Sequence, residues 1–146
     1  MITRRIQSED SEEWISMREA LWPETGEEQH RKEMAMMLSD TDRYAVFVCE
    51  DGPGELVGFA EVSLRSWAEG CLSSPVGYLE GWYVVAQYRE KGVGKALLSA
   101  SEDWARSRGC TEMASDTNIG NEASEAAHLA LGFEVVGRVV AFRKDL

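Results

Sequence analysis

The segment from Arg89 to Lys95 contains the residues whose types and spacing point most directly to chemistry. It places three cations, Arg89, Lys91 and Lys95, around Gly92 and Gly94. We expect it to join a strand to a helix, whose first N–H groups have no partner within the helix and carry partial positive charge. Glycines also let a phosphate approach the backbone closely. The spacing predicts an anion site, most simply for a diphosphate, with a ligand-free glycine turn as the alternative.

Two other phosphate-binding motifs do not match this segment. A dinucleotide fingerprint requires a third glycine three residues after Gly94, where Leu97 stands. A P-loop requires Ser or Thr after the Gly-Lys pair and a glycine five residues before Gly94, but Ala96 and Arg89 occupy these positions. The anion site therefore belongs to neither class.

Two carboxylates and two tryptophans form a second set of candidates. We expect Glu80 to lie within a strand and Asp116 to end its neighbour, so that both face one cleft. There they would bind ammonium groups, and one would take a proton from an attacking amine. Trp22 and Trp67 would line the same cleft as an aromatic wall for sugars and cations. The alternatives are solvated or turn-forming carboxylates and tryptophans buried in the core.

Hydrophobic periodicity and turn signals predict the elements that hold these residues. The chain indicates a mixed α/β fold in the order β-α-α-β-β-β-α-β-α-β-β. The predicted strands are 1–6, 44–50, 56–65, 76–85 and 111–115, with two more within 133–143 around a turn near Gly137. The first predicted helix begins at Ser8 or Ser11 and ends near Trp22. Three further helices are predicted over 27–38, 93–108 and 121–131.

Three local patterns inside these elements make specific predictions. Gly81, in the middle of a strand, indicates a bulge or a close approach by a ligand. The second helix should turn Met34, Met37 and Leu38 inward. The third should bury one face, formed by Val93, Leu97, Leu98, Ser101, Trp104 and Ala105.

Composition limits the class of protein. With 146 residues and 44% apolar residues, we expect residues 1–146 to form one domain. A net charge of −11 argues against nucleic acid or an anionic membrane as partner and permits a cationic substrate in an acidic cleft. We expect neither a secretory signal nor a membrane span. Cys49, Cys71 and Cys110 form no metal or disulfide motif, which is typical of reduced thiols in a cytoplasmic protein.

The loop motif and the order of elements resemble the GNAT superfamily of N-acetyltransferases over nearly the whole chain. Within it, five short segments resemble the type I aminoglycoside 6'-N-acetyltransferases. These are Leu21-Trp22-Pro23, Ser73-Ser74-Pro75-Val76, Leu79-Glu80-Gly81, Met113-Ala114-Ser115-Asp116 and the stretch from His128 to Phe133. The fold that this resemblance implies is the GNAT fold, a mixed, mostly antiparallel central sheet flanked by helices.

The resemblance implies acetyl-coenzyme A as cosubstrate. Its diphosphate would be held by the backbone of Arg89, Glu90, Lys91, Gly92, Val93, Gly94 and Lys95. Its pantetheine arm would pair with Trp82, Tyr83 and Val84, and one of these amides would polarise the acetyl carbonyl. Asn121 resembles the asparagine that contacts this arm from the following helix.

The resemblance also suggests how protons move. His128 stands where many GNAT proteins carry a tyrosine that acts as general acid for the departing thiolate. Alternatively His128 is a packing residue, Tyr83 or Tyr88 is the acid, or the thiolate leaves unaided. Related enzymes carry a tyrosine near Trp67 and a glutamate near Gly137. The change to Trp67 is expected to affect substrate preference, and the change to Gly137 removes one expected acidic contact with the substrate.

Together these features predict acetyl transfer to a primary amine, most specifically the 6'-amine of an aminoglycoside, as in antibiotic resistance. Direct attack is expected, because no cysteine or serine stands in a nucleophile motif. No metal is expected, and relatives suggest a homodimer. The alternatives are a GNAT enzyme acting on a polyamine, metabolite or peptide amine, a non-catalytic acyl-coenzyme A sensor, and an unrelated α/β binding domain.

Overall fold

The computed structural model describes residues 1–146 and contains one five-stranded sheet in the order β1-β2-β3-β4-β5. The strands are β1 (Ile2–Arg5), β2 (Tyr44–Glu50), β3 (Leu56–Arg65), β4 (Val76–Val84) and β5 (Met113–Ser115). All neighbours pair antiparallel except β4 and β5, which are parallel. The sheet confirms the predicted mixed, mostly antiparallel architecture.

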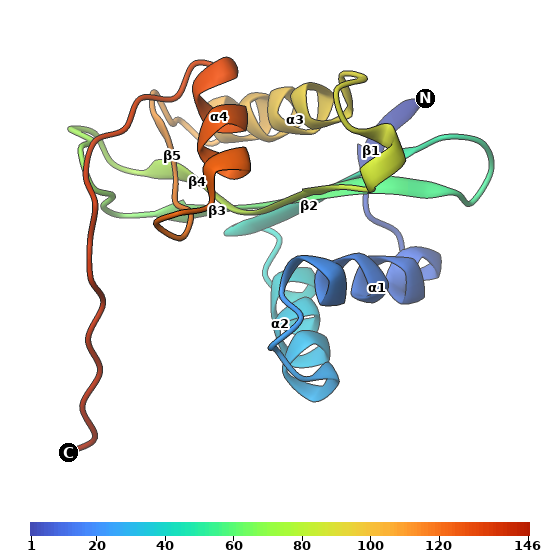
Figure 1. The fold of residues 1–146 in the computed structure, drawn as a ribbon, viewed down its shortest axis with the longest axis horizontal. Coiled ribbons are helices and arrows are strands. Elements are labelled where there is room, and N and C mark those ends of the chain that lie inside the picture. The colour runs from blue at the N-terminus through green and yellow to red at the C-terminus, as the bar shows by residue number, and fades with distance from the viewer.

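Four helices flank the two faces of the sheet (Figure 1). Helices α1 (Ser11–Leu21) and α2 (Glu27–Ser39) cover one face, and α3 (Val93–Ser107) and α4 (Glu122–Ala130) lie on the other. None of the helices is long and apolar enough to cross a bilayer. The six residues predicted to form the inner face of α3 are all buried, which confirms the period-3.6 pattern.

The first two helices differ in detail from the sequence-based expectation. Neither Ser8 nor Ser11 caps α1; a short 3-10 helix (Ser8–Asp10) precedes it, and Asp10 accepts the backbone N–H of Gln7 instead. In α2, Met34 and Met37 are buried as predicted, but Leu38 is exposed. The fully buried His30 lies two turns before Leu38 and takes the inward position on this helix.

The prediction of two final strands within 133–143 is wrong. After α4 the chain continues without regular structure and runs away from the sheet to its end (Figure 1). A segment rich in β-branched residues forms a strand only where the edge of a sheet can pair with its backbone. The edge strand β5 is only three residues long. The segment therefore leaves apolar side chains in solvent, namely those of Val135, Val136, Val139, Val140 and Phe142.

Candidate functional site

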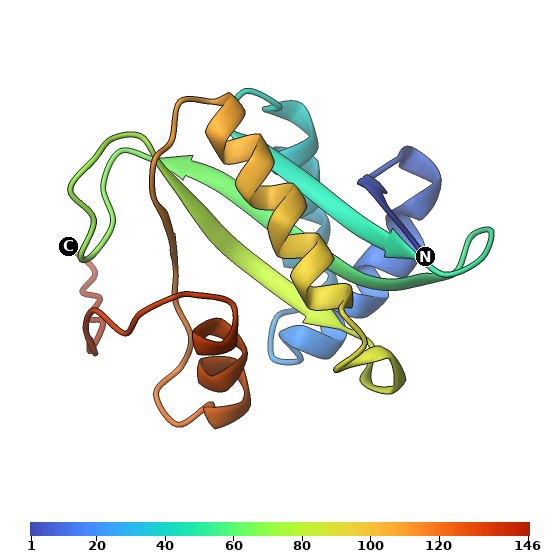
Figure 2. The ribbon, with the colours of Figure 1, turned by 90° about the horizontal axis from the view of Figure 1, so that it is seen from above.

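Strands β4 and β5, the last two strands of the sheet, part after three paired residues and leave an opening. They pair only from Gly77 to Leu79 on β4, opposite Met113 to Ser115 on β5. Beyond Leu79, β4 continues to Val84 with β3 as its only partner. On the side of β5 this stretch has no strand to pair with. Apart from the Val84 carbonyl, which accepts from Arg89, its outward backbone groups are therefore available to an extended ligand. Figure 2 shows β5 and α4 standing apart from the end of β4.

The predicted anion loop follows β4 after a short 3-10 helix (Ala86–Tyr88) and leads into α3. Gly92 adopts the left-handed conformation (φ 86°) that favours glycine, and no side chain caps the helix. The first N–H groups of α3 are therefore open to a ligand. The loop is tied to β4 twice: Arg89 Nε donates to the carbonyl of Val84 (2.9 Å), and Trp82 Nε1 donates to that of Gly94 (3.1 Å).

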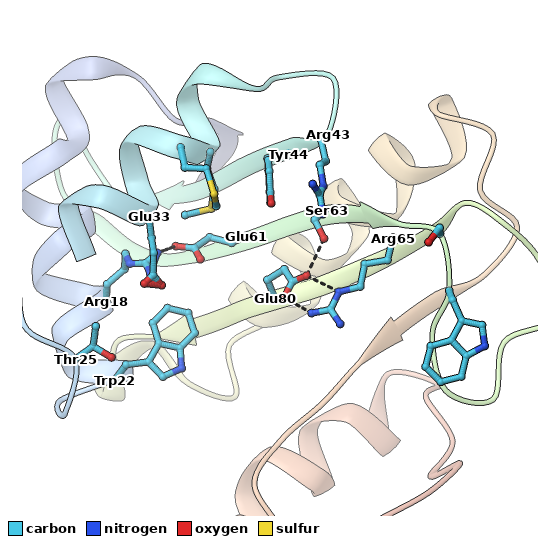
Figure 3. Close-up of a pocket in the computed structure, with 14 residues that line it drawn as sticks. Arg18, Trp22, Thr25, Glu33, Arg43, Tyr44, Glu61, Ser63, Arg65 and Glu80 are labelled. Atoms are coloured by element: carbon cyan, nitrogen blue, oxygen red, sulfur yellow. Dashed lines mark hydrogen bonds and ion pairs between the residues drawn. The ribbon is translucent and has the colours of Figure 1, made fainter. Parts of the chain in front are cut away.

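A cavity of about 760 Å³ lies between the sheet and the helices α1 and α2 (Figure 3). Three of the residues predicted for the acceptor cleft line it: Trp22, Trp67 and Glu80. Asp116 does not line this cavity. The β-bulge indicated by Gly81 is present, since the register between β3 and β4 shifts next to Glu61. The bulge turns Glu80 toward the same face as Ser63 on β3.

Glu80 is already engaged within the protein. Its carboxylate accepts two hydrogen bonds from Arg65, at 2.9 and 2.8 Å, and one from the hydroxyl of Ser63 at 2.8 Å (Figure 3). A bidentate guanidinium contact of this kind is among the stronger charged hydrogen bonds. An incoming ammonium group would therefore share Glu80 with Arg65 or displace it.

Arg65 also connects Glu80 to Asp116. Its guanidinium carbon lies 3.4 Å from the centroid of the Tyr78 ring, and the Tyr78 hydroxyl donates to Asp116. Burial, followed by this hydrogen bond, raises the pKa of Tyr78. Arg65, which itself lines the cavity, therefore contacts Glu80 directly and Asp116 only through the Tyr78 ring.

The cavity wall carries balanced charge, in contrast to the expected acidic cleft. Three carboxylates and three guanidinium groups line it, from Glu33, Glu61, Glu80, Arg18, Arg43 and Arg65. The overall charge of −11 is thus not concentrated on this wall. No group of three or more His, Cys, Asp or Glu side chains is arranged to hold a metal ion.

His128 and Asn121 both make local contacts in and around α4. His128 Nδ1 lies 2.7 Å from the carbonyl of Ser124, so this nitrogen carries the hydrogen, and Nε2 lies 2.8 Å from the hydroxyl of Ser115. Asn121 is the N-cap of α4, with its side-chain oxygen accepting the Ser124 N–H. Both ring nitrogens of His128 are used within the protein, which fits the packing role better than direct proton donation.

The residues that sequence reasoning missed are Arg18, Glu61 and Arg65. A usable signal was present in the strand 56–65, where Glu61, Ser63 and Arg65 alternate with apolar residues in an otherwise apolar run. Alternation places these three on one face of the sheet. Polar residues on a covered face indicate a site.

The chain is similar to known proteins over its whole length. Residues 14–133 match the model of the acetyltransferase (GNAT) family. A protein of Klebsiella aerogenes named aminoglycoside N(6')-acetyltransferase type 1 is 49% identical, over 99% of this chain and 97% of that protein. A protein of the same name from Stenotrophomonas maltophilia is 44% identical, over 98% of this chain and 92% of its own.

Two solved structures extend the similarity to the fold. A structure of AAC(6')-Iy in complex with the bisubstrate analogue CoA-S-monomethyl-acetylneamine superimposes with a TM-score of 0.92 at 38% identity, covering 99% of this chain and 98% of that one. The apo aminoglycoside 6'-N-acetyltransferase AAC(6')-IG from Acinetobacter haemolyticus gives 0.94 at 32% identity, covering 100% and 99%.

Proposed function

This chain belongs to the acetyltransferase (GNAT) family, and on that premise we propose that it transfers the acetyl group of acetyl-coenzyme A to the 6'-amine of an aminoglycoside antibiotic. The observation that carries the proposal is the similarity, over nearly full length, to proteins named aminoglycoside N(6')-acetyltransferase, at 49% and 44% identity. A related structure at 38% identity contains an analogue that joins coenzyme A to an acetylneamine.

The opening between β4 and β5 supports a cosubstrate site. We propose that the backbone amides from Arg89 to Lys95 hold the diphosphate of coenzyme A and that the free edge from Trp82 to Val84 pairs with its pantetheine arm. One amide of this edge would donate to the acetyl oxygen and stabilise the negative charge that develops on it. Asn121, at the start of α4, would contact the arm from the other side of the opening.

The cavity beside α1 and α2 supports an acceptor site. We propose that Trp22 and Trp67 form its aromatic walls and that Glu80, inside the cavity, and Asp116, outside it beside Tyr78, hold the ammonium groups. One of these two acids takes the proton from the attacking amine, directly or through water. His128 stays the proposed proton donor for the departing thiolate: as an imidazolium it would donate from Nε2 to the Ser115 hydroxyl, which would pass its own hydrogen to the thiolate and leave His128 neutral.

The proposal also covers the whole chain as a unit. We propose that residues 1–146 form a single domain that works as a homodimer in the cytoplasm. The exposed apolar side chains after α4 support contact with a second copy of this chain. The three free cysteines are typical of a reducing compartment.

A thiol-release assay tests the activity. We expect acetyl-coenzyme A with kanamycin or tobramycin to release thiol, and Glu80→Gln and Asp116→Asn each to lower kcat/KM about 100-fold, as for loss of an acid–base group. The control is Asp103→Asn, an exposed carboxylate on α3. Acetylation of spermidine but not of kanamycin would overturn the substrate assignment. Binding of coenzyme A without turnover of any amine would indicate a sensor instead.

A further inference from the structure

Glu61 is a carboxylate on the floor of the acceptor cavity that no part of the proposed mechanism uses. It stands on β3 directly opposite Gly81 of β4. Glu61 is only 3% exposed, yet it lines the cavity together with Trp22 and Glu80 (Figure 3). A charged group at such a depth requires compensation by specific partners.

One oxygen of Glu61 takes all of its hydrogen bonds. Oε1 accepts from Arg18 Nη1 at 2.7 Å and from Trp14 Nε1 at 3.0 Å. Oε2 accepts none, although a carboxylate can accept on both oxygens. It lies 3.2 Å from the position that a Cβ on Gly81 would occupy, so a side chain there would crowd this oxygen.

The charge around Glu61 is incompletely neutralised. Arg18, itself buried, divides its guanidinium between Glu61 and Glu33, which it reaches at 3.1 Å. His30, also buried, makes its hydrogen bond to Arg18 and not to Glu61: its Nδ1 accepts from Arg18 Nε. Burial raises the pKa of Glu61 to about 7, against the lowering effects of Arg18 and Trp14. A cation beside Oε2 would supply the missing charge.

The other carboxylate on the cavity wall near β4 is less open, because an ammonium group there would have to share Glu80 with Arg65 or displace it. Glu80 already accepts three hydrogen bonds from Ser63 and Arg65. An ammonium group next to Glu61 would gain a charged hydrogen bond without displacing an arginine. The Trp22 ring lies close to Glu61 Oε2: its edge is 2.6 Å from the position that a Cβ on Gly81 would occupy, and Oε2 is 3.2 Å from the same position.

We infer that Glu61 binds a second ammonium group of the acceptor, one other than the amine that is acetylated, and so selects acceptors that carry several amines. The inference rests on the proposed function. It assigns Glu61 a role in substrate binding and specificity, while proton transfer stays with the residues named above. A single-amine acceptor would leave Oε2 without a partner.

Kinetics of Glu61→Gln with two acceptors tests this. Kanamycin carries several amines, and 6-amino-6-deoxyglucose carries only one. We expect the substitution to raise KM for kanamycin about tenfold, as for loss of one charged hydrogen bond, and to leave KM for the single amine and for acetyl-coenzyme A within about twofold. Trp14→Phe is the matched control, because it removes the other donor to Oε1 without changing charge and lies outside the cavity.

The outcomes separate this inference from the proposed function. Equal rises in KM for both acceptors, a rise with Trp14→Phe as large as that with Glu61→Gln, or no rise for kanamycin would overturn it. Calorimetric titration of kanamycin gives the same comparison without turnover. Should Glu61→Gln not fold, Glu61→Asp retains the charge beside Arg18 and carries the test, with a smaller expected rise. Failure of the wild-type chain to acetylate kanamycin would instead overturn the proposed function.

Discussion

Gly81 shows how one residue without a side chain shapes the acceptor cavity. A Cβ at this position would lie 2.6 Å from the Trp22 ring and 3.2 Å from the Glu61 carboxylate. The glycine thus lets an aromatic wall and a buried acid meet at the β-bulge. Its φ angle is ordinary, so the requirement for glycine comes from close approach and not from backbone conformation.

We predict that Gly81→Ala displaces Trp22 and weakens acceptor binding. Overpacking of this kind costs about 1–3 kcal/mol in the free energy of unfolding. Thermal denaturation should show the loss, and KM for the acceptor should rise while KM for acetyl-coenzyme A stays unchanged. Gly26→Ala is the control, because a Cβ there meets nothing within 4 Å. A Gly81→Ala variant with wild-type stability and KM would contradict this account of the cavity.

Among the elements, the junction of β1 and α1 depends on a charged group. Asp10 accepts two hydrogen bonds from Arg4, at 2.7 and 2.9 Å, and one from the backbone of Gln7. Arg4 also reaches Glu50 at the end of β2. The hydrogen bonds from Arg4 are the main cause that lowers the pKa of Asp10, so folding favours its charged form.

The lowered pKa predicts the direction of a pH dependence. The unfolded chain binds a proton at Asp10 more readily than the folded one, so this contribution is complete above the unfolded pKa of about 3.9 and is lost as pH falls through the folded pKa. Asp10→Asn should therefore cost about 2 kcal/mol at pH 7 and much less near pH 2. Denaturant unfolding at both pH values measures it.

A solvent-exposed ion pair serves as the control for this experiment. Asp42 reaches Arg108 at 3.4 Å from an almost fully exposed position, so Asp42→Asn should change stability little at either pH. Equal losses for Asp10→Asn at both pH values would show that the carboxylate charge is not what stabilises the junction.

At the scale of the whole molecule, the chain leaves a long apolar surface uncovered. The side chain of Phe142 is 92% exposed, and four valines between residues 135 and 140 are more than half exposed. Val136 contacts the loop at Gly70, and Arg138 pairs with Glu125, but beyond Arg138 the segment leaves the body of the protein. Apolar surface of this kind favours a partner.

We predict that the wild-type chain elutes as a dimer and that Phe142→Asp shifts it to the monomer, because a charge would have to be buried in the contact. Light scattering coupled to size exclusion measures the mass. Leu38→Asp changes an exposed apolar residue on α2 and should leave the dimer intact. A monomeric wild-type chain at micromolar concentration would overturn the homodimer proposal.

Local patterns in the sequence were sufficient for most of the elements, though not for the two final strands, and for the glycine loop before α3. The bounds of β2 and β3 follow from two runs separated by the turn signal at residues 51–54, the buried face of α3 follows from the 3.6-residue period, and Gly81 indicated the bulge. These signals act between residues a few positions apart, where backbone geometry dictates which side chains share a face. The same reasoning located the helix N-terminus behind Arg89.

The partners of the charged groups, by contrast, follow from the folded structure. Glu61 meets Arg18 across 43 residues, Glu80 meets Arg65 across 15, and Asp116 meets Tyr78 across 38. Such pairs depend on strand register and on which helix covers which face, and a shift of one residue would reverse every side chain on a strand. The final segment was misjudged for the same reason, because a strand requires an edge that only the assembled sheet can provide.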